Sequence, residues 1–414
     1  DSYPNFAFGL DTSKLAPESL RDRETSYNLI RTRSISPRFG IMEQQSGPGG
    51  WNTRMIQPAP KPGQLRLWTF QSVAHGADFV SYFRWRTCAF GTEMYWHGLL
   101  NYDNRDNRRL TELRRTHADL EKIQCAAGAK YAAKVAVLCD YDNEWDGIED
   151  KWHGPLRGKS MDAIFKALQR AHVPFDFVNI DDAGTSAPLG DYAAAFYPHP
   201  TIITEARTAQ LESYVQAGGR LVIGCRGGYK DIYGKCPMAP MPGPLARLTG
   251  CTVEEFTFLG PADAPETILW ENEAVPAPDF NDVLHPEAAD CAVLGTYQGN
   301  YYGGKPGLTA HPFGSGTAYA FGAVFSEAAV RRFLTLFGIG CPEAGLELPE
   351  GVELAVRESA AGRRFVFLLN YLAEPQEIAL RGAAYRDLLT GRTLAENETV
   401  EPYGVLVLEK QAEK

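Results

Sequence analysis

The chain has 414 residues, of which 44% are hydrophobic and 22% are charged. These proportions are ordinary for a soluble globular protein, and the length is enough for two or three domains. The formal net charge is −10 and no basic run occurs, which argues against nucleic acid or an acidic membrane surface as a partner. No apolar run approaches the roughly 20 residues that a membrane-spanning helix needs.

The first residues and the cysteine pattern bear on the cellular compartment of the protein. The first residues, Asp1 to Pro4, lack the charged and apolar regions of a signal peptide. The eight cysteines are scattered, without any C-x-x-C pair. Free thiols in a reducing cytoplasm fit this pattern better than a disulfide framework. The cysteine spacing does not call for a zinc site, and it leaves that question open.

The first 126 residues alternate helical and strand-like segments. A buried strand is expected to end at Glu43, directly before a Gly/Pro-rich loop. A carboxylate at the end of a strand beside such a loop is typical of the catalytic face of a (β/α)₈ barrel. The expected helices are Thr12–Thr32 (N-cap Thr12 or Ser13, with Pro17 in its first turn), Gly63–Ala74 and Asn107–Ala126, and the expected strands are Phe39–Met42 and Phe79–Trp85.

From about residue 128 strands and helices alternate again, which predicts a mostly parallel, doubly wound sheet. The acidic and aromatic segment Asp140–Asp150 is expected to be a loop. The expected strands are Val135–Leu138, Phe175–Val178, Tyr192–Tyr197 and Arg220–Gly224, and the expected helices are Ser160–Ala171, Thr204–Ala217 and Ser326–Gly338. From residue 346 short alternating segments predict an antiparallel β-domain with strands at Val352–Arg357, Arg363–Asn370, Gln376–Leu380, Tyr385–Leu388 and Val405–Leu408.

One succession of motifs points to a family. Glu43-Gln44-Gln45-x-Gly47-Pro48 is followed by Trp51, then by Gly63 to Trp68, and then by Ala74 to Arg86. This succession resembles the glycoside hydrolase family 42 β-galactosidases, from the nucleophile strand through the last barrel strand. The resemblance implies three parts. They are the C-terminal part of a TIM barrel (1–127, strands 6–8), a flavodoxin- or amidotransferase-like α/β trimerisation domain (128–345) and a small antiparallel β-domain (346–414).

The same resemblance implies that Glu43 is the nucleophile of a retaining glycosidase. Such an enzyme needs a second carboxyl group as general acid and base, about 5–5.5 Å away. In the family this group belongs to an Asn-Glu pair on the fourth barrel strand, which is expected upstream of Asp1. The pairs Asn143-Glu144, Asn272-Glu273 and Asn397-Glu398 lie in the later domains and are interpreted as surface pairs. This chain by itself is therefore expected to be inactive.

Further positions match substrate contacts of the family. Trp51 matches a sugar-packing Trp, Phe83 an aromatic at the end of the eighth strand, and Glu93 a carboxylate that binds galactose hydroxyls. Tyr3 matches a Tyr near the nucleophile. Many members have Glu-x-x-His where this chain has Glu93-Met94-Tyr95-Trp96-His97. Whether Trp96 or His97 faces the sugar stays open at the level of sequence.

Plainer interpretations compete for several residues. Arg84 and Arg86 are expected to form structural ion pairs rather than to hold Glu43 ionised. His75 is expected to be a packing residue. Cys225, at a Gly-rich turn after a strand, could be an amidotransferase nucleophile, but the chain offers no convincing His-Glu partner pair, so a structural thiol is preferred.

The predicted function is therefore a retaining β-galactosidase that acts through a covalent galactosyl-Glu43 intermediate, with no cofactor and no metal. The resemblance implies a homotrimer, with a galactoside as substrate. An α-L-arabinopyranosidase of the same fold is the first alternative, because arabinopyranose is galactose without its C6 hydroxymethyl group. A non-catalytic oligomerisation or sugar-binding fragment is the second. The preferred linkage and aglycone are left open.

Overall fold

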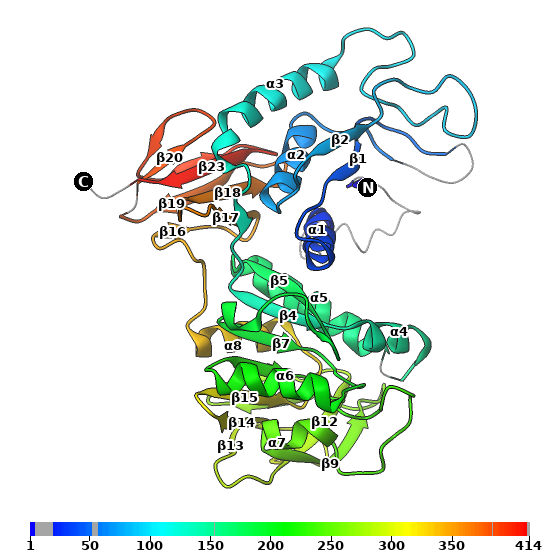
Figure 1. Cartoon of the computed structure of the whole chain (residues 1–414), viewed down its shortest axis with the longest axis vertical. Helices are drawn as coiled ribbons and strands as arrows, with labels where there is room; N and C mark the ends of the chain where they lie inside the picture. Colours follow the sequence, from blue (N-terminus) through cyan, green and yellow to red (C-terminus); the bar gives the residue numbers. More distant parts are fainter. Residues whose placement is uncertain (5–19, 52–56, 153, 383, 412–414) are drawn as a thin grey trace. The chain divides into compact units, whose positions relative to one another are not determined.

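The computed structural model describes residues 1–4, 20–51, 57–152, 154–382 and 384–411 (Figure 1). The chain separates into two compact units. Unit 1 combines Asp1–Ala132 with Cys341–Lys414, and unit 2 is Ala133–Gly340. Helices and mixed sheets occur in the chain, so the predicted α/β class is confirmed. The division into three domains at residues 127 and 345 stays a prediction.

Over its described residues, the first part of unit 1 contains two parallel strands and three long helices. β1 pairs with β2 in parallel, with Ile41 opposite Val80 and Gln45 opposite Phe83. Asn107 caps the third helix, because its side chain accepts a hydrogen bond from the backbone NH of Leu110. The elements are η3 (Arg21–Arg23), α1 (Glu24–Ile35), β1 (Ile41–Gln45), α2 (Gln64–Ala74), β2 (Val80–Phe83), α3 (Arg108–Lys122) and η4 (Gln124–Ala126).

Two details of this part differ from the sequence prediction. Of the expected helix Thr12–Thr32, the described part is α1 from Glu24, while the expected cap, Thr12 or Ser13, and the first-turn Pro17 lie outside the described residues. The spacing of Leu113, His117 and Leu120 along the expected helix Asn107–Ala126 would place His117 on the apolar face, but His117 is exposed and Thr116 is buried instead. Thr116 can be buried because its hydroxyl donates to the backbone carbonyl of Glu112, one turn earlier.

The C-terminal part of unit 1 is built from antiparallel strands. Its six-stranded sheet has the order β21-β20-β23-β18-β17-β3, so a short strand from before unit 2 completes the sheet. A three-stranded sheet of order β16-β19-β22 accompanies it. The strands are β3 (Lys130–Tyr131), β16 (Leu346–Glu347), β17 (Val352–Glu358), β18 (Arg364–Asn370), β19 (Gln376–Leu380), β20 (Tyr385–Asp387), β21 (Thr393–Leu394), β22 (Glu398–Val400) and β23 (Val405–Lys410).

β17 is buried on both faces, although its sequence alternates polar and apolar residues. Leu354 and Val356 belong to one hydrophobic core, while Ala355 packs into a second core that includes α2. Glu353, on that second face, is fully buried. A buried carboxylate needs hydrogen-bond partners. Those of Glu353 are the side chains of Ser26, His75 and Tyr371, the last of which directly follows β18.

His75, directly after α2, is one of these partners. Its Nε2 lies 3.0 Å from Oε1 of Glu353. Ser26 Oγ donates to Oε2 of the same carboxylate at 2.8 Å, and Tyr371 donates to it at 2.6 Å. His75 also stacks on Tyr131, with ring centroids 5.4 Å apart. The expectation that His75 is a packing residue is thus incomplete, because the ring also makes a buried polar contact.

Unit 2 is organised around a ten-stranded sheet of order β11-β10-β13-β14-β15-β8-β7-β4-β5-β6. The strands from β15 through β5 run parallel, and the pairs outside them are antiparallel. The expected mostly parallel sheet is therefore mixed. The strands are β4 (Val135–Cys139), β5 (Phe175–Asp181), β6 (Gly184–Thr185), β7 (Ala194–Tyr197), β8 (Arg220–Ile223), β10 (Thr267–Trp270), β11 (Glu273–Pro276), β13 (Ala292–Tyr297), β14 (Pro306–Phe313) and β15 (Gly316–Phe321).

A two-stranded sheet and several helices complete unit 2. Thr204 and Ser326 cap helices as expected, because their side chains accept hydrogen bonds from the backbone NH of Arg207 and of Ala329. The remaining elements are α4 (Tyr141–Glu149), α5 (Gly154–Arg170), η5 (Leu189–Asp191), α6 (Glu205–Gln216), η6 (Gly243–Leu245), α7 (Ala246–Thr249), β9 (Cys251–Phe258), β12 (Phe280–Pro286) and α8 (Glu327–Phe337).

The predicted loop over Asp140–Asp150 is wrong, because most of it forms helix α4. Asp140 caps this helix by accepting a hydrogen bond from the backbone NH of Asn143 at 2.8 Å. Asn143 is buried and also donates to the backbone carbonyl of Ile202. The interpretation of Asn143-Glu144 as a surface pair is therefore wrong for Asn143. Within the described parts of the chain, no helix combines the length and apolar character that crossing a membrane requires.

Candidate active site

Glu43 is the third of the five residues of β1, so it does not end the strand as expected. Its side chain is half-buried, while its neighbour Met42 is 64% exposed and Gln44 is buried. Ser2 flanks the strand, since its backbone NH donates to the carbonyl of Glu43 and its carbonyl accepts from the NH of Gln45. The carboxylate is thus held by a strand that has neighbours on both sides.

Tyr3 places a hydroxyl on the Glu43 carboxylate. Its OH donates to Oε2 of Glu43 across 2.7 Å. Burial and then the neighbouring Glu43 carboxylate raise the pKa of Tyr3 above its ordinary value of 10. Tyr3 therefore keeps its proton at neutral pH and remains a donor, which fixes the orientation of the carboxylate.

Two loops meet beside this pair of residues. His97 donates from its backbone NH to the carbonyl of Pro48 at 2.9 Å. A Cβ on Gly47 would lie 2.4 Å from the carbonyl oxygen of His97, and a Cβ on Gly49 would lie 2.7 Å from Cα of Trp96. Glycine is therefore required at these two positions for the loops to approach this closely. The contact brings the segment around Trp96 next to the end of β1.

Trp96 is the centre of an aromatic cluster at this junction. Its ring centroid lies 5.2 Å from that of Tyr3, 6.2 Å from that of Phe83 and 6.3 Å from that of Trp51. The contacts with Tyr3 and Phe83 are edge-to-face, which is a favourable arrangement for aromatic pairs. Trp96 is only 7% exposed. The structure therefore brings together Tyr3, Glu43, Trp51, Phe83 and Trp96.

His97 lies in a different environment from its neighbour in sequence. Its ring meets that of Tyr102 edge-to-face, with centroids 5.0 Å apart. Burial and the nearby Arg109 lower the pKa of His97, so the imidazole is neutral at pH 7. Among the described residues, the ring that packs on Tyr3 beside Glu43 is therefore that of Trp96.

Glu93 joins the site through an ion pair. Arg84 donates from its guanidinium to Oε2 of Glu93, and the guanidinium also lies 4.1 Å from the centroid of the Phe83 ring. The expected structural ion pair of Arg84 is thus present. Its partner could not be predicted, because the pairing depends on how the loop after β2 folds back. Ser46 helps to fix that loop by donating to the carbonyl of Phe83 at 2.6 Å.

Comparison with known proteins agrees with this geometry. Residues 1–123 match a family described as "Beta-galactosidase", residues 133–338 match "Beta-galactosidase trimerisation domain", and residues 351–410 match "Beta-galactosidase C-terminal domain". The chain belongs to glycoside hydrolase family 42. The resemblance inferred from the motifs around Glu43 is confirmed.

Relatives of family 42 are longer than this chain. Beta-galactosidase BgaA of Clostridium cellulovorans is 30% identical over 385 residues, which are 90% of this chain and 55% of that protein. BglY of Alicyclobacillus acidocaldarius is 29% identical over 440 residues, which cover 100% of this chain and 60% of that protein. The solved β-galactosidase of Bacillus circulans sp. alkalophilus has a TM-score of 0.85 at 25% identity, covering 97% and 59%. The chain thus spans little more than half the length of these relatives.

The thiol of Cys225, considered from the sequence as a possible nucleophile, does not fit that role in this family 42 chain. The carbonyl of Cys225 can only accept a hydrogen bond, so Nδ1 of His199, 2.8 Å away, carries the ring proton and donates to it. Nε2 of His199 then accepts from Ser160 Oγ at 2.7 Å. The imidazole therefore cannot take the thiol proton at Nδ1 in this arrangement.

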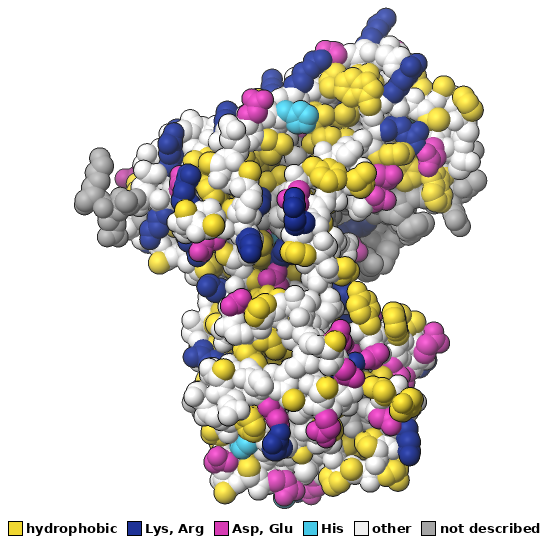
Figure 2. All heavy atoms as spheres, viewed as in Figure 1, with side chains coloured by type: hydrophobic (Ala, Val, Ile, Leu, Met, Phe, Trp, Pro, Cys, Tyr) yellow, Lys and Arg dark blue, Asp and Glu magenta, His cyan; other side chains and the backbone are white. Residues whose placement is uncertain are grey.

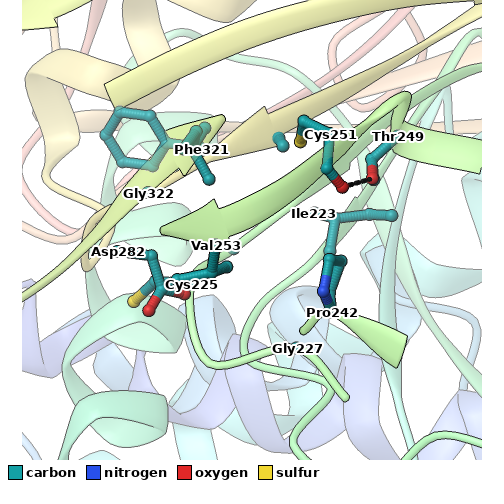
Figure 3. A pocket seen from close by; sticks show the side chains of 13 residues that line it. Ile223, Cys225, Gly227, Pro242, Thr249, Cys251, Val253, Asp282, Phe321 and Gly322 are labelled. Atoms are coloured by element: carbon teal, nitrogen blue, oxygen red, sulfur yellow. Dashed lines mark hydrogen bonds between the residues drawn. The ribbon is translucent and has the colours of Figure 1, made fainter. Parts of the chain in front are cut away.

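The surroundings of Cys225 also disfavour a thiolate. Figure 3 shows its sulfur beside the carboxylate of Asp282, in a cavity of about 20 Å³. Burial and then the Asp282 charge raise the pKa of the thiol well above 9. Over the described ranges, no three His, Cys, Asp or Glu side chains gather closely enough to hold a metal ion.

Proposed function

We propose that this chain is part of a retaining β-galactosidase in which Glu43 attacks the anomeric carbon of a terminal β-D-galactoside. The observation that carries the proposal is the short hydrogen bond from Tyr3 to the half-buried Glu43 carboxylate inside an aromatic cluster. A fixed carboxylate is what formation of a covalent glycosyl intermediate requires. Membership of family 42 supports the substrate class.

The aromatic cluster and the ion pair suit a sugar. Trp51 and Phe83, which are half-buried, offer ring surface on which the apolar face of a pyranose can pack, and the buried Trp96 packs behind them. Glu93 can accept hydrogen bonds from sugar hydroxyls, and Arg84 holds its carboxylate in place. A galactoside bound there would have oriented hydroxyls and its anomeric carbon near Glu43.

The general acid and base is proposed to come from outside these 414 residues. Relatives of the family are longer, and the Asn-Glu pairs of this chain lie in unit 2 or in the C-terminal sheet region. One of them, Asn143, is used to hold Asp140 and Ile202. The chain alone is therefore expected to hydrolyse ordinary galactosides negligibly.

The parallel strands β1 and β2, with their helices, are proposed to be the last strands of a (β/α)₈ barrel, here within residues 1–127. A flavodoxin- or amidotransferase-like fold is proposed for the mixed sheet of unit 2. A homotrimer is proposed because residues 133–338 match a trimerisation domain. A cytoplasmic location is proposed because all eight cysteines are free thiols.

Covalent labelling tests the nucleophile. A 2-deoxy-2-fluoro-β-galactoside with a dinitrophenolate leaving group reacts without a general acid, since that leaving group departs unprotonated. The expected result is a fluorogalactosyl mass on the Ile41–Gln45 peptide, and its loss in Glu43→Gln. The labelling is done on this chain and on a longer chain that includes the preceding residues. A label that persists in Glu43→Gln, or that sits on another carboxylate, refutes the assignment.

The same experiment separates the two alternatives. Faster labelling by the corresponding 2-fluoro-α-L-arabinopyranoside would favour the arabinopyranosidase, because that sugar lacks only the C6 hydroxymethyl group. Galactose binding without any label, in the longer chain as well, would favour a non-catalytic sugar-binding protein.

A further inference from the structure

Unit 2 contains a buried arginine whose guanidinium makes no direct hydrogen bond or ion pair among the described residues. Arg226 is 7% exposed, and over the described residues no carboxylate or carbonyl forms an ion pair or hydrogen bond with its guanidinium. Only its backbone NH is used, as a donor to Oδ2 of Asp282 at 2.7 Å. Buried charges are normally paired, because removing a charge from water is costly.

A second arginine of unit 2 shows what the usual solution looks like. Arg207 is 3% exposed and forms ion pairs with three carboxylates, those of Asp140, Asp142 and Asp182. Its burial is thus compensated inside unit 2. Arg207 and Arg226 are both buried arginines. They differ in that carboxylates of the same chain form ion pairs with Arg207 but not with Arg226.

Aromatic rings surround the Arg226 guanidinium instead. Its central carbon lies 3.9 Å from the ring centroid of Tyr229, 5.0 Å from that of Phe280, 5.9 Å from that of Trp152 and 6.0 Å from that of Phe256. Such rings attract a cation through their faces but satisfy none of its N–H groups. We call these four rings with Arg226 the arginine box.

The arginine box opens onto an exposed apolar surface. Trp152 is 59% exposed, and it continues a line of exposed side chains on α4, namely Tyr141, Trp145 and Ile148. The spacing of four and three residues places Tyr141, Trp145 and Ile148 along one face of α4, and Trp152 follows just after the helix ends. Figure 2 shows yellow apolar side chains beside magenta carboxylates on the surface around α4. Exposed aromatic side chains with an arginine at their edge are typical of the central residues of protein interfaces.

We propose that the arginine box and the exposed face of α4 form a contact between copies of this chain, in which Arg226 binds a carboxylate of a second copy. The inference rests on the proposed homotrimer. The occupant is a second copy because unit 2 matches a trimerisation domain, and because a chain of net charge −10 has carboxylates in excess on its own surface. A guanidinium fork binds a carboxylate through two parallel hydrogen bonds, which gives direction as well as attraction.

If Arg226 serves a contact between copies, its charge is not needed for the stability of the isolated unit 2. In the isolated subunit Nε of Arg226 is buried without a hydrogen-bond partner, and the guanidinium interacts with the Asp282 carboxylate only through space, without an ion-pair contact. Replacing Arg226 by methionine, which keeps the length and removes the charge, should leave the melting temperature of unit 2 unchanged or raise it. The same change at Arg207 should lower the melting temperature, because three carboxylates would lose their partner.

Sedimentation velocity over a range of protein concentrations tests the proposal, with melting followed on the same samples. Arg226→Met should weaken assembly at least tenfold without lowering the melting temperature, and Arg226→Lys should weaken it less, because it keeps the charge but not the fork. Arg247→Met, at an exposed arginine paired with Glu212, should assemble like the native chain. If Arg226→Met assembles like the native chain, or melts early as Arg207→Met does, the inference is wrong and the homotrimer stands. A native chain that stays monomeric overturns both the proposed Arg226 contact and the proposed homotrimer. The labelling of Glu43 tests the galactosidase activity independently of assembly.

Discussion

Tyr3 and Glu43 are brought together because the segment around Ser2 runs beside β1. The ring of Tyr3 is also held edge-to-face against Trp96, which fixes the direction of its hydroxyl group. The hydroxyl therefore acts by orienting the carboxylate rather than by moving a proton. Its raised pKa has the same consequence, because a tyrosine that keeps its proton remains a donor.

Tyr3→Phe should slow fluorogalactosyl labelling of Glu43 by roughly tenfold, as expected for the loss of one hydrogen bond to a charged group. Since the pKa of Tyr3 lies above 10, ionisation of Tyr3 should cause no fall in the labelling rate of the native protein up to pH 10. The measurement is the labelling rate against pH by mass spectrometry. Tyr95→Phe is the control, because Tyr95 directly precedes Trp96 in the sequence but is exposed to solvent. Equal rates for the two variants would contradict this role.

Trp96 and His97 were not separable from the sequence, because the loop that carries them has no regular period. The structure separates them through contacts with Tyr3 and Phe83 on one side and with Tyr102 on the other. Trp96→Ala should lower the free energy of unfolding of unit 1 by about 3 kcal/mol, as for other buried aromatic truncations. His97→Ala should cost less than about 1 kcal/mol. Chemical denaturation of both variants checks this, and similar losses would show that His97 shares the packing role.

At the scale of elements, short sequence patterns predict those features that depend only on residues close together in the sequence, such as helix caps. Thr204 and Ser326 begin two of the expected helices, and both are N-caps in the structure, since a cap needs only an oxygen and a backbone NH three residues later. The motif around Glu43 and Trp51 likewise lies within one stretch of sequence. Helix α4 was missed because its acidic composition resembles a loop, although Asp140 is a good N-cap. Composition alone therefore does not separate a loop from a capped acidic helix, whereas the cap residue and the apolar spacing do.

Glu353 could not be predicted, because its burial depends on side chains far away in the sequence. Ser26 lies 327 residues from it and His75 lies 278 residues from it. Burial alone would raise the pKa of Glu353, but the His75 contact, nearby Arg23 and the Tyr371 hydroxyl outweigh it and hold the pKa at about 2. The carboxylate therefore fastens the C-terminal sheet to the first helices of unit 1 only while it is ionised.

Glu353→Gln should destabilise unit 1 by about 3 kcal/mol at pH 7, which corresponds to the difference between an ordinary pKa of 4.5 and one of about 2. A depressed folded-state pKa contributes stability above the unfolded value, so the native protein should lose this amount as the pH falls from about 4.5 toward 2. The variant should lack that part of the pH dependence. Denaturation at pH 3 and pH 6 measures it.

Glu358→Gln is the matched control for that experiment. Glu358 lies on the same strand, but it is exposed and pairs with Arg364 at the surface. Exposed ion pairs contribute little, so the change should cost less than about 1 kcal/mol at either pH. If Glu353→Gln and Glu358→Gln lose the same stability, the buried contact of Glu353 with His75 does not stabilise the C-terminal sheet of unit 1.

At the scale of the molecule, the two units carry buried carboxyl groups with opposite pKa shifts. In unit 2, burial raises the pKa of Asp282 to about 6, against the effect of the hydrogen bonds from the Arg226 NH and from Tyr229. A raised folded-state pKa contributes stability below the unfolded value, which is lost as the pH rises through the folded value. Asp282 thus favours unit 2 at low pH, while Glu353 favours unit 1 at high pH.

Asp282→Asn should therefore stabilise unit 2 at pH 7 by up to about 3 kcal/mol, the difference between 3.8 and about 6. The amide can keep both contacts, because its oxygen can accept from the Arg226 NH while its NH₂ donates to the Tyr229 hydroxyl. The native unit 2 should lose this stability between pH 4 and pH 6, and the variant should not. Calorimetry at pH 4 and pH 7 measures the change for unit 2, and unit 1 serves as the internal reference because its Glu353 is untouched. A variant that is less stable than the native protein at pH 7 would show that Asp282 is held ionised by its two donors.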